Sequence, residues 1–446
     1  MSRLSVAYQE RNAEGGVEKV YLYPSMRRGG RQIYAFEANV SPRSRAPRLM
    51  WKFGCPYKST DDGCASGASA IGQTWSTPRP IRVKGDDTLY LVFGGGYDDC
   101  EDTNSCETQS KGRGIFVLNA VTGRLATYID LGAMPGVVAG RVVADIVPVD
   151  VNGDGYTDLL YAVDTRGHVW RTNVSNPSGD NPYTGYAPTS WASHTRLIAK
   201  VADWSAEARR RKFQYAPDVV VLGGTANIFV GTGDREQPLP RSAASKVRNR
   251  FYGLRDNYAD GAYEGAPAVS VIDDHNDCDP AGDATLKDGC HLLNVTTLST
   301  SLDYNPALQD PRVRGWVFDL NSTEPPYEQV VTSPVTVGGV VYFSTFQAKN
   351  GSDSNVCSNL GTARGYAVNF LTGGLRPGDK DRAAEFVGGG LPPSPVAGIV
   401  EIGDRKYPFI LGGRQPGKGS SLEGGKVPVH ISPVRKKIYR YQKIDK

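Results

Sequence analysis

The chain has 446 residues, of which 39% are hydrophobic and 22% are charged, and its formal net charge is +4. This small, evenly mixed charge argues against nucleic acid or an acidic membrane as a partner. No stretch approaches the roughly 20 apolar residues that a membrane-spanning helix needs, so we expect no membrane span. Gly (52), Pro (29) and Tyr (23) are frequent whereas Met (4) is rare, which favours short strands and turns. The composition therefore predicts an all-β fold.

Short apolar runs that end in turn residues recur from the start of the chain. Residues 19–23 and 32–37 form a hairpin pattern around the basic, Gly-rich connection 27–31. Arg27 and Arg28 in this connection fit two interpretations, an anion grip or a solvated or ion-paired turn, and the turn is favoured. Further candidate strands occupy residues 89–93, 218–222, 227–233, 315–320, 335–343 and 409–413.

Six of the seven cysteines fall into close pairs separated by short polar stretches. The pairs are Cys55 with Cys64, Cys100 with Cys106, and Cys278 with Cys290. This spacing suggests three local disulfides, although six cysteines allow 15 arrangements. Disulfides imply an oxidising compartment, so we expect export to the periplasm or the cell surface.

The seventh cysteine and the beginning of the chain leave two questions open. Cys357 is either a reactive or intermolecular thiol or a buried, unpaired cysteine. Residues 1–24 contain no apolar signal-peptide core, so an export signal is expected upstream of Met1.

Residues 150–158 read as a calcium loop. Calcium prefers six to eight oxygen ligands, which alternate residues of a tightly curled loop can supply. The expected ligands are the side chains of Asp150, Asn152, Asp154 and Asp158 and the backbone carbonyl of Tyr156. Gly155 lies where the loop must turn sharply, so a positive φ is expected there. Three carboxylates in nine residues repel one another unless a cation is present, which favours calcium over a solvated Asx/Gly turn.

The residues after this loop distinguish it from a helical EF-hand. An EF-hand has a bidentate Glu at position twelve, where this chain has Tyr161. Residues 159–163 are apolar and read as a strand, so the loop is expected to join β-structure.

Strand-turn units recur along the chain. Residues 114–123 and 364–373 share a strand, an Asn and a Thr-Gly turn, and residues 160–171 carry a related version. Such repetition is typical of a radial β-architecture whose four-stranded blades pack on their neighbours. We therefore expect a β-propeller, a single domain over 1–446 with a flexible beginning (1–18) and a basic tail (435–446).

Long polar insertions decorate the predicted blades. They cover residues 172–196, 234–250 and 273–312, and residues 205–211 have the composition of a short helix. His275 lies in the acidic segment 273–279. This segment fits two interpretations, a second metal site or a solvated loop, and the solvated loop is favoured.

An ordered set of motifs resembles a known family. The stretches are Arg27–Gly30, Gly72–Ser76, Phe93–Asp98, Asp150–Asp158 followed by Tyr161, Asp164, Gly167 and Trp170–Arg171, then Gly231–Gly233, Phe251–Tyr252, Gly315–Leu320 and Tyr342–Phe346. Together they resemble the C-terminal domain of the PilY family, the type IV pilus biogenesis factors and tip adhesins. The set spans most of the chain. An Arg-Gly-Asp motif, which some members use to bind integrins, does not occur in the sequence.

The resemblance implies a modified propeller of roughly seven blades, related to quinoprotein dehydrogenases, at the pilus tip or outer membrane. It also implies that calcium in the 150–158 loop regulates pilus extension against retraction, and hence twitching motility and surface attachment. Minor pilins, the pilus machinery and a host or abiotic surface would be the partners. Family members usually have a further N-terminal region and a signal peptide, which this sequence lacks.

Two other functions compete with a non-enzymatic pilus module. A quinoprotein dehydrogenase would use a quinone cofactor and calcium, but many such enzymes carry adjacent cysteines, which this sequence lacks. An adhesion or lectin propeller outside pili would repeat its Asp-rich loop in several blades, whereas only one good copy is present. The pilus module is therefore preferred.

Overall fold

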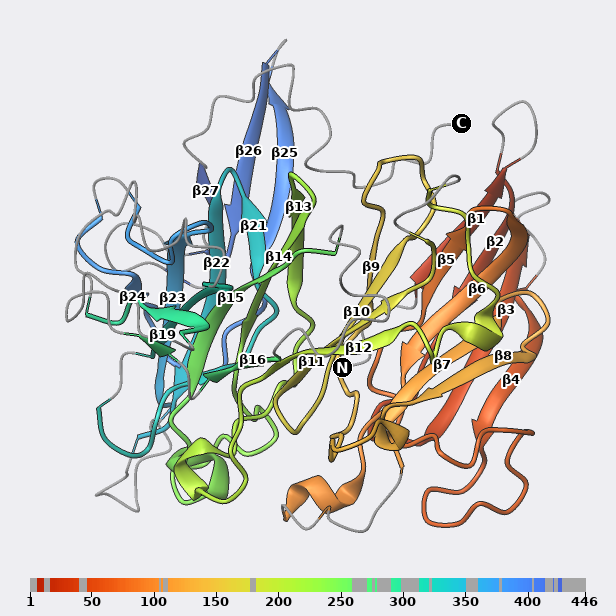
Figure 1. Cartoon of the computed structure of the whole chain (residues 1–446), viewed down its shortest axis with the longest axis horizontal. Helices are drawn as coiled ribbons and strands as arrows, with labels where there is room; N and C mark the ends of the chain where they lie inside the picture. Colours follow the sequence, from red (N-terminus) through yellow and green to blue (C-terminus); the bar gives the residue numbers. More distant parts are fainter. Residues whose placement is uncertain are drawn as a thin grey trace. The chain divides into compact units, whose positions relative to one another are not determined.

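We describe the fold from a computed structural model. The described residues are 6–11, 17–39, 46–103, 106, 111–176, 182–258, 271–274, 277–278, 290–297, 313–320, 323–349, 360–376, 379–402, 405–413, 420 and 424–426. Within them all regular structure is β-strand or short 3₁₀ helix, which confirms the all-β prediction (Figure 1). The 3₁₀ helices are η1 (Asp99–Asp102), η2 (Leu131–Ala133), η3 (Pro188–Ser190), η4 (Glu207–Arg209) and η5 (Ala243–Lys246). None of these described helices is long enough to cross a membrane.

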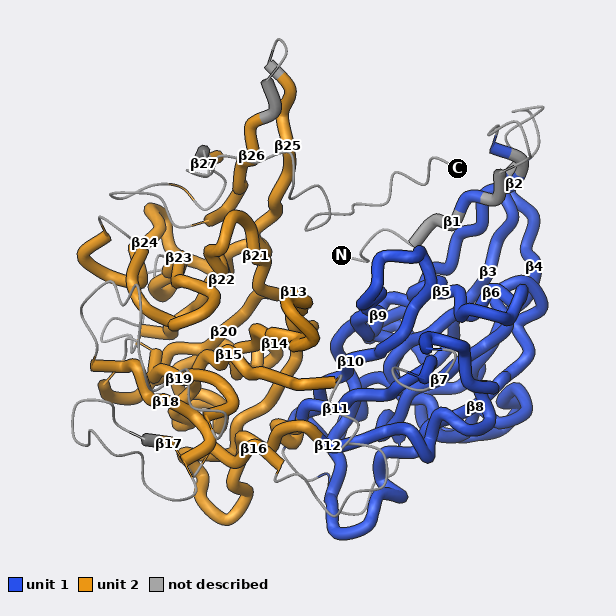
Figure 2. The backbone as a smooth tube through the Cα atoms, turned by 45° about the horizontal axis from the view of Figure 1, so that its top comes forward, with its two compact units in different colours: residues 1–165, 169–197, 432–446 blue, residues 166–168, 198–431 orange. Residues whose placement is uncertain are grey.

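The chain divides into two compact units, which are described separately (Figure 2). Unit 1 comprises residues 1–165, 169–197 and 432–446, and unit 2 comprises residues 166–168 and 198–431. The single-domain prediction for 1–446 stays a prediction. The flexible beginning (1–18) lies partly, and the basic tail (435–446) wholly, outside the described residues.

Unit 1 is built from successive antiparallel strands that pair with their neighbours along the chain. Its first sheet contains β1 (Val6–Arg11), β2 (Val17–Tyr23), β3 (Arg31–Asn39) and β4 (Arg48–Cys55). Its second contains β5 (Arg79–Val83), β6 (Asp86–Gly94), β7 (Gly114–Asn119) and β8 (Leu125–Asp130). Its third contains β9 (Val147–Val149), β10 (Leu159–Val163), β11 (His168–Asn173) and the start of β12 (Thr195–Lys200). This up-and-down order is that of propeller blades.

The middle sheet of unit 1 buries both of its faces. Leu91 and Phe93 on β6 pack in a cluster with side chains of the first sheet, whereas Tyr90 and Val92 pack in a cluster with the third. Successive residues of a strand point to opposite faces, so a strand buried on both faces needs an unbroken apolar run. This is why residues 89–93 show no polar alternation.

Unit 2 also contains three described sheets. The first has the order β13 (Asp218–Leu222), β14 (Thr225–Gly231), β15 (Arg250–Asp256), β19 (Gly315–Asp319), β18 (Leu292–Asn294), β17 (Asp277–Cys278). The second has the order β20 (Gln329–Val330), β22 (Val340–Gln347), β23 (Thr362–Asn369), β24 (Ala383–Glu385), with β21 (Val335–Val337) also on β22. The third contains β25 (Val396–Ile402), β26 (Arg405–Leu411) and β27 (Gly424–Lys426), while β16 (Ile272–Asp273) pairs with the end of β12. The six sheets refer to described residues only and do not count the blades of the whole chain.

Two local predictions need correction. Residues 335–343 form the hairpin β21–β22 and not one strand, because Gly338 and Gly339 have φ of +60° and +80° and turn the chain between them. The helix predicted at residues 205–211 is reduced to the single 3₁₀ turn η4.

The predicted strand-turn repeat is present in both units with matching hydrogen bonds. The Asn119 side chain accepts the amides of the two residues that begin its turn, and the Gly123 amide returns to the Asn119 carbonyl (2.9 Å). Asn369 and Gly373 make the same set of bonds. Both glycines have left-handed φ, +72° and +65°. The Asn and Gly of the motif therefore have defined roles in one turn.

Each repeat turn is covered by a tryptophan from the preceding sheet of its unit. The indole of Trp51 donates to the Ala120 carbonyl (3.0 Å) in one turn, and that of Trp316 donates to the Phe370 carbonyl (3.2 Å) in the other. A Cβ atom at either turn glycine would lie 2.6 Å from the indole ring. The turn thus joins successive sheets as well as successive strands.

Candidate metal centre

The predicted calcium loop connects β9 and β10 in unit 1. The Asp158 amide donates to the Val149 carbonyl (2.9 Å), and the ladder continues with Leu159 opposite Val149. The loop therefore begins and ends on two adjacent antiparallel strands, which confirms that it joins β-structure and that residues 159–163 form a strand.

The side chain of Asp150 shapes the first half of the loop. Its Oδ1 accepts the Gly153 amide (2.6 Å) and its Oδ2 accepts the Gly155 amide (2.8 Å). The two glycines have φ of +75° and +94°, so the expected positive φ at Gly155 is confirmed. A Cβ at Gly155 would meet no atom within 4 Å, so backbone conformation and not space requires glycine there.

The next two predicted ligands bond to the same stretch of backbone. Asn152 Oδ1 accepts the Asp154 amide (2.9 Å), and Asp154 Oδ1 accepts the Tyr156 amide (3.0 Å). The Asn152 amide group donates to Asp154 Oδ2 (3.2 Å), which places the side chains of positions three and five side by side. Tyr156 is exposed at its side chain, as suits a position expected to contribute only a carbonyl.

Asp158 is the buried end of the loop, with 2% of its surface exposed. It accepts the Val151 amide at Oδ2 (2.9 Å) and the Ser175 hydroxyl at Oδ1 (2.7 Å). Burial raises the pKa of Asp158, the charges of Asp150 and Asp154 raise it further, and the two hydrogen bonds oppose the rise. The loop therefore holds its negative charges at a cost that a cation would relieve.

The donor chemistry of these five residues fits calcium, a hard ion that prefers carboxylate, amide and carbonyl oxygens. A carboxylate oxygen that accepts one amide keeps a further lone pair for a metal. The carboxylates of Asp150, Asp154 and Asp158 do not bring three oxygens within 4.8 Å of one another. Among the described residues, Cys55, Asp61 and Cys64 do meet that distance, but the two sulfurs form a disulfide.

The structure adds neighbours of the loop that sequence reasoning missed. The Lys84 ammonium lies 3.3 Å from Asp154 Oδ2, and the Arg82 carbonyl accepts the Thr157 amide (2.8 Å). Arg82 lies on β5, Lys84 lies in the β5–β6 turn, and Ser175 follows β11. Because these residues reach the loop through the packing of separate strands, no local sequence signal identifies them.

The other sequence candidates have structural explanations where they are described. Arg28 forms a two-bond pair with Asp102, the closer at 3.0 Å, and stacks over Trp75 and Tyr97, which supports the ion-paired turn over the anion grip. In the acidic segment 273–279, Asp274 and Asp277 pair with Arg250, each at 2.9 Å. An arginine thus supplies the positive charge there, while His275 lies outside the described residues.

Two of the three predicted disulfides are present, Cys55–Cys64 and Cys100–Cys106. Cys290 is disulfide-bonded, whereas the side chain of Cys278 is not described, so the third pairing stays a prediction. Cys357 lies outside the described residues.

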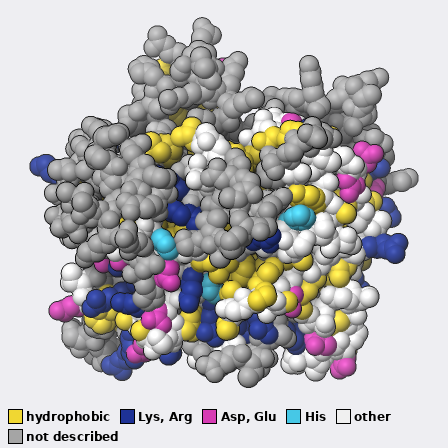
Figure 3. Space-filling view, viewed as in Figure 1, with side chains coloured by type: hydrophobic (Ala, Val, Ile, Leu, Met, Phe, Trp, Pro, Cys, Tyr) yellow, Lys and Arg dark blue, Asp and Glu magenta, His cyan; other side chains and the backbone are white. Residues whose placement is uncertain are grey.

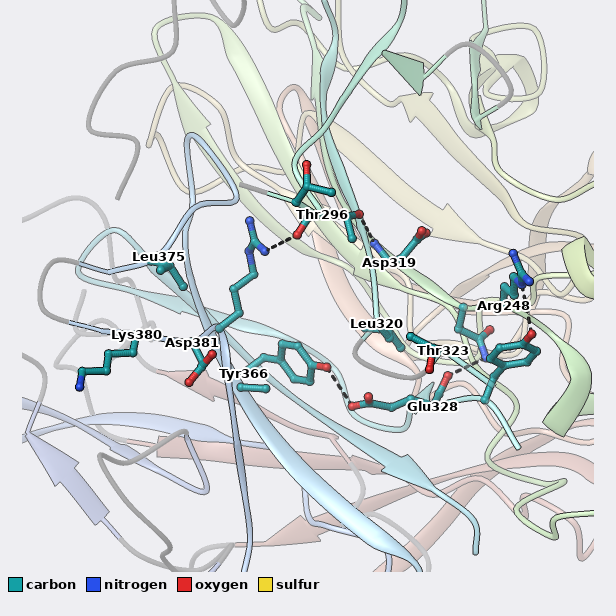
Figure 4. Close-up of a pocket in the computed structure, with 15 residues that line it drawn as sticks. Arg248, Thr296, Asp319, Leu320, Thr323, Glu328, Tyr366, Leu375, Lys380 and Asp381 are labelled. Carbon is teal, nitrogen blue, oxygen red and sulfur yellow. Dashed lines mark hydrogen bonds between the residues drawn. The ribbon is translucent and has the colours of Figure 1, made fainter. Parts of the chain in front are cut away.

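Unit 2 contains a polar cavity of about 510 Å³ (Figure 4). At its floor Tyr366 and Glu328 point toward one another, and Glu328 accepts the Tyr366 hydroxyl (3.0 Å) and an Arg364 nitrogen (3.1 Å). Arg382 donates to the carbonyls of Gly373 (2.9 Å) and Thr296 (3.1 Å). These contacts join β23 to segments that flank β18, β20, β23 and β24 in unit 2, so a structural role accounts for them.

On the face of the molecule shown in Figure 3, described side chains of positive and negative charge are interspersed.

Stacked antiparallel sheets, a recurring strand-turn unit and one Asp-rich loop between adjacent strands define the chain as a β-propeller with a candidate calcium loop. The model of the PilY1 beta-propeller domain matches residues 5–271, more than half of the chain. The chain belongs to this family.

Two further comparisons agree with this assignment. The type IV pilus biogenesis factor PilY1 homolog of Xylella fastidiosa is 23% identical over 414 residues, which cover 87% of this chain and 25% of that protein. The crystal structure of the Pseudomonas aeruginosa PilY1 C-terminal domain has a TM-score of 0.59 at 17% identity, over 91% of this chain and 81% of the other. This structural likeness supports the fold, and the chain spans about a quarter of the length of its Xylella relative.

Proposed function

We propose that this chain is the calcium-responsive propeller module of a type IV pilus biogenesis factor and that it acts without catalysis. The observation that carries the proposal is the 150–158 loop, an oxygen-rich turn with its charged end buried, within a PilY1 propeller domain. The name of the Xylella relative supports the pilus role.

The chain's own residues suggest how the loop would respond. Asp150 and Asn152 hold the turn through its backbone amides, and Asp158 anchors it against Ser175. Bound calcium would supply the positive charge that lets Asp150, Asp154 and Asp158 approach one another. The filled loop would stiffen the β9–β10 connection and the surface beside it.

We infer that this surface, displayed at the pilus tip or outer membrane after passage through the periplasm, contacts minor pilins and the pilus machinery. Loop occupancy would then regulate pilus extension against retraction, and so twitching motility and surface attachment. In the same proposal, the module also binds a ligand on a host or abiotic surface.

The first test compares thermal unfolding of the purified chain in calcium and in chelator. Binding to the folded state alone adds about 2.7 kcal/mol at 100 times Kd, so calcium should raise the melting temperature and titrate in calorimetry. Asp154→Asn keeps an oxygen for the Tyr156 amide but removes the charge, so its calcium response should fall sharply. Asp62→Asn, at an exposed position outside the loop, is the matched control and should respond as the wild type does. An unchanged melting temperature together with no calorimetric binding would eliminate the site.

The second test addresses the pilus role in cells. Deletion of the gene should abolish surface pili and twitching, and the wild-type gene should restore both. Asp150→Ala in the full-length gene should restore pili incompletely or leave twitching insensitive to calcium. Normal pili and twitching after deletion would contradict the proposed function.

A further inference from the structure

The ion pair between Lys84 and Asp154 places a cation of the chain itself on the candidate calcium loop. The Lys84 ammonium is 3.3 Å from Asp154 Oδ2, with 45% and 27% of the two side chains exposed. We propose that Lys84 is a built-in competitor of calcium, which neutralises Asp154 in the metal-free loop and is displaced when calcium binds. This inference rests on the proposed function and extends it to the regulation of the same site.

The backbone that carries Lys84 is fixed beside the loop. Its carbonyl accepts the Gly185 amide (2.9 Å), and the carbonyl of Arg82 accepts the Thr157 amide (2.8 Å). Gly85 completes the β5–β6 turn at φ +85°. The turn therefore stays next to the loop whether or not the ion pair exists, and the flexible side chain of Lys84 is the part that moves.

Asp154 is also the loop carboxylate most open to such competition. Asp150 and Asp158 each use both oxygens on loop amides or on Ser175, and Asp158 is buried. Asp154 offers Oδ2 to two side-chain donors, Lys84 and the Asn152 amide. A lysine ammonium is a compact point charge on a flexible stem, so it can occupy the oxygen and leave it again.

Competition has a measurable consequence for affinity. The ammonium opposes calcium by like charge and by its hold on Asp154, so Lys84→Gln should tighten calcium binding by about twofold to tenfold. The gain should shrink at high salt, because the pair is partly exposed and screened. Lys84 thus lowers the calcium affinity of the loop, so the loop responds only at higher calcium concentrations.

The experiment measures the calcium Kd by calorimetry for the wild type and three variants of the whole chain. Lys84→Gln should bind more tightly, and Lys84→Arg, which keeps the charge, should stay near the wild type. Lys58→Gln removes a lysine from another half-exposed pair, 3.1 Å from Asp99, and controls for net charge. An unchanged or weaker Kd in Lys84→Gln, or an equal gain in Lys58→Gln, would overturn the proposal.

A calcium-free measurement separates this inference from the proposed function. In chelator, the melting temperatures of the wild type, Lys84→Gln, Asp154→Asn and the double variant form a double-mutant cycle. We expect the two single effects to be non-additive, because each removes the same ion pair. Additive effects would show that Lys84 does not neutralise Asp154, even if the wild type binds calcium. A wild type that binds no calcium would overturn both proposals.

Discussion

At the scale of single residues, His291 in unit 2 accepts a hydrogen bond that favours its neutral form. Its Nδ1 accepts the Asp273 amide (3.1 Å), which requires that nitrogen to carry no proton. Burial lowers the pKa of His291 below its ordinary value and the charge of Arg314 lowers it further, while Asp273 opposes the shift. Folding therefore favours the neutral imidazole.

This arrangement predicts a pH dependence of stability. Because the folded pKa lies below the unfolded value of about 6.5, the contribution is complete above that pH and is lost as pH falls toward the folded pKa. Urea unfolding of the wild type and of His291→Gln should differ more at about pH 7.5 than at about pH 5.5. Gln keeps an acceptor but does not titrate, so its stability curve should be flatter over this range. A wild type no more pH-sensitive than the variant would contradict the assignment.

The turn of the candidate calcium loop could be predicted from sequence because its five candidate ligands lie within nine positions and the turn depends on local backbone geometry. Lys84 and Ser175 could not be predicted in this way, since both reach Asp154 and Asp158 only through strand packing. The ion pairs of the acidic segment with Arg250 have the same origin. Local motifs thus predict the candidate ligands of the loop, whereas long-range packing brings Lys84 and Ser175 to them.

At the scale of the elements, the same arrangement recurs in both units: an Asn–Gly turn packs against a tryptophan of the preceding sheet and accepts a hydrogen bond from its indole. The repeat was visible in sequence because Asn and Gly have local roles in the turn. Trp51 and Trp316 lie far from their turns along the chain, so their part in the arrangement was not visible. The apolar run 335–343 predicts one strand, but Gly338 and Gly339 turn the chain within it and divide it into two.

The packing of Trp316 on this turn predicts that Gly373→Ala strongly lowers the free energy of unfolding. A methyl group there would adopt φ +65° and lie 2.6 Å from the Trp316 ring, so strain and overpacking add to about 2–4 kcal/mol. Gly223→Ala, at φ +59° with no atom within 4 Å, carries the strain alone and should cost about 1 kcal/mol. Urea unfolding measures both. Equal losses in the two variants would show that the indole contact contributes nothing.

At the scale of the whole molecule, both units are built from antiparallel sheets, but only unit 1 contains the candidate calcium loop. The disulfides Cys55–Cys64 and Cys100–Cys106 lie in unit 1, as does the candidate calcium loop, and Cys290 of unit 2 is also disulfide-bonded. The first sheet of unit 2 is extended by the short parallel strands β17 and β18, which come from the insertion 273–312. Composition and repeats predicted the class of fold, but they did not predict the division into units or these added strands.

The position of the loop predicts that calcium acts on one unit. Its described contacts to Val149, Arg82, Lys84 and Ser175 all lie within unit 1. Local openings can differ in free energy across one structure, so calcium should slow amide exchange in residues 150–163 and leave β22 in unit 2 unchanged. Hydrogen-deuterium exchange with mass spectrometry checks this, with Asp154→Asn in calcium as the control that should lose the protection. Equal protection of β22 would mean that the units open together, and no protection at the loop would count against calcium binding there.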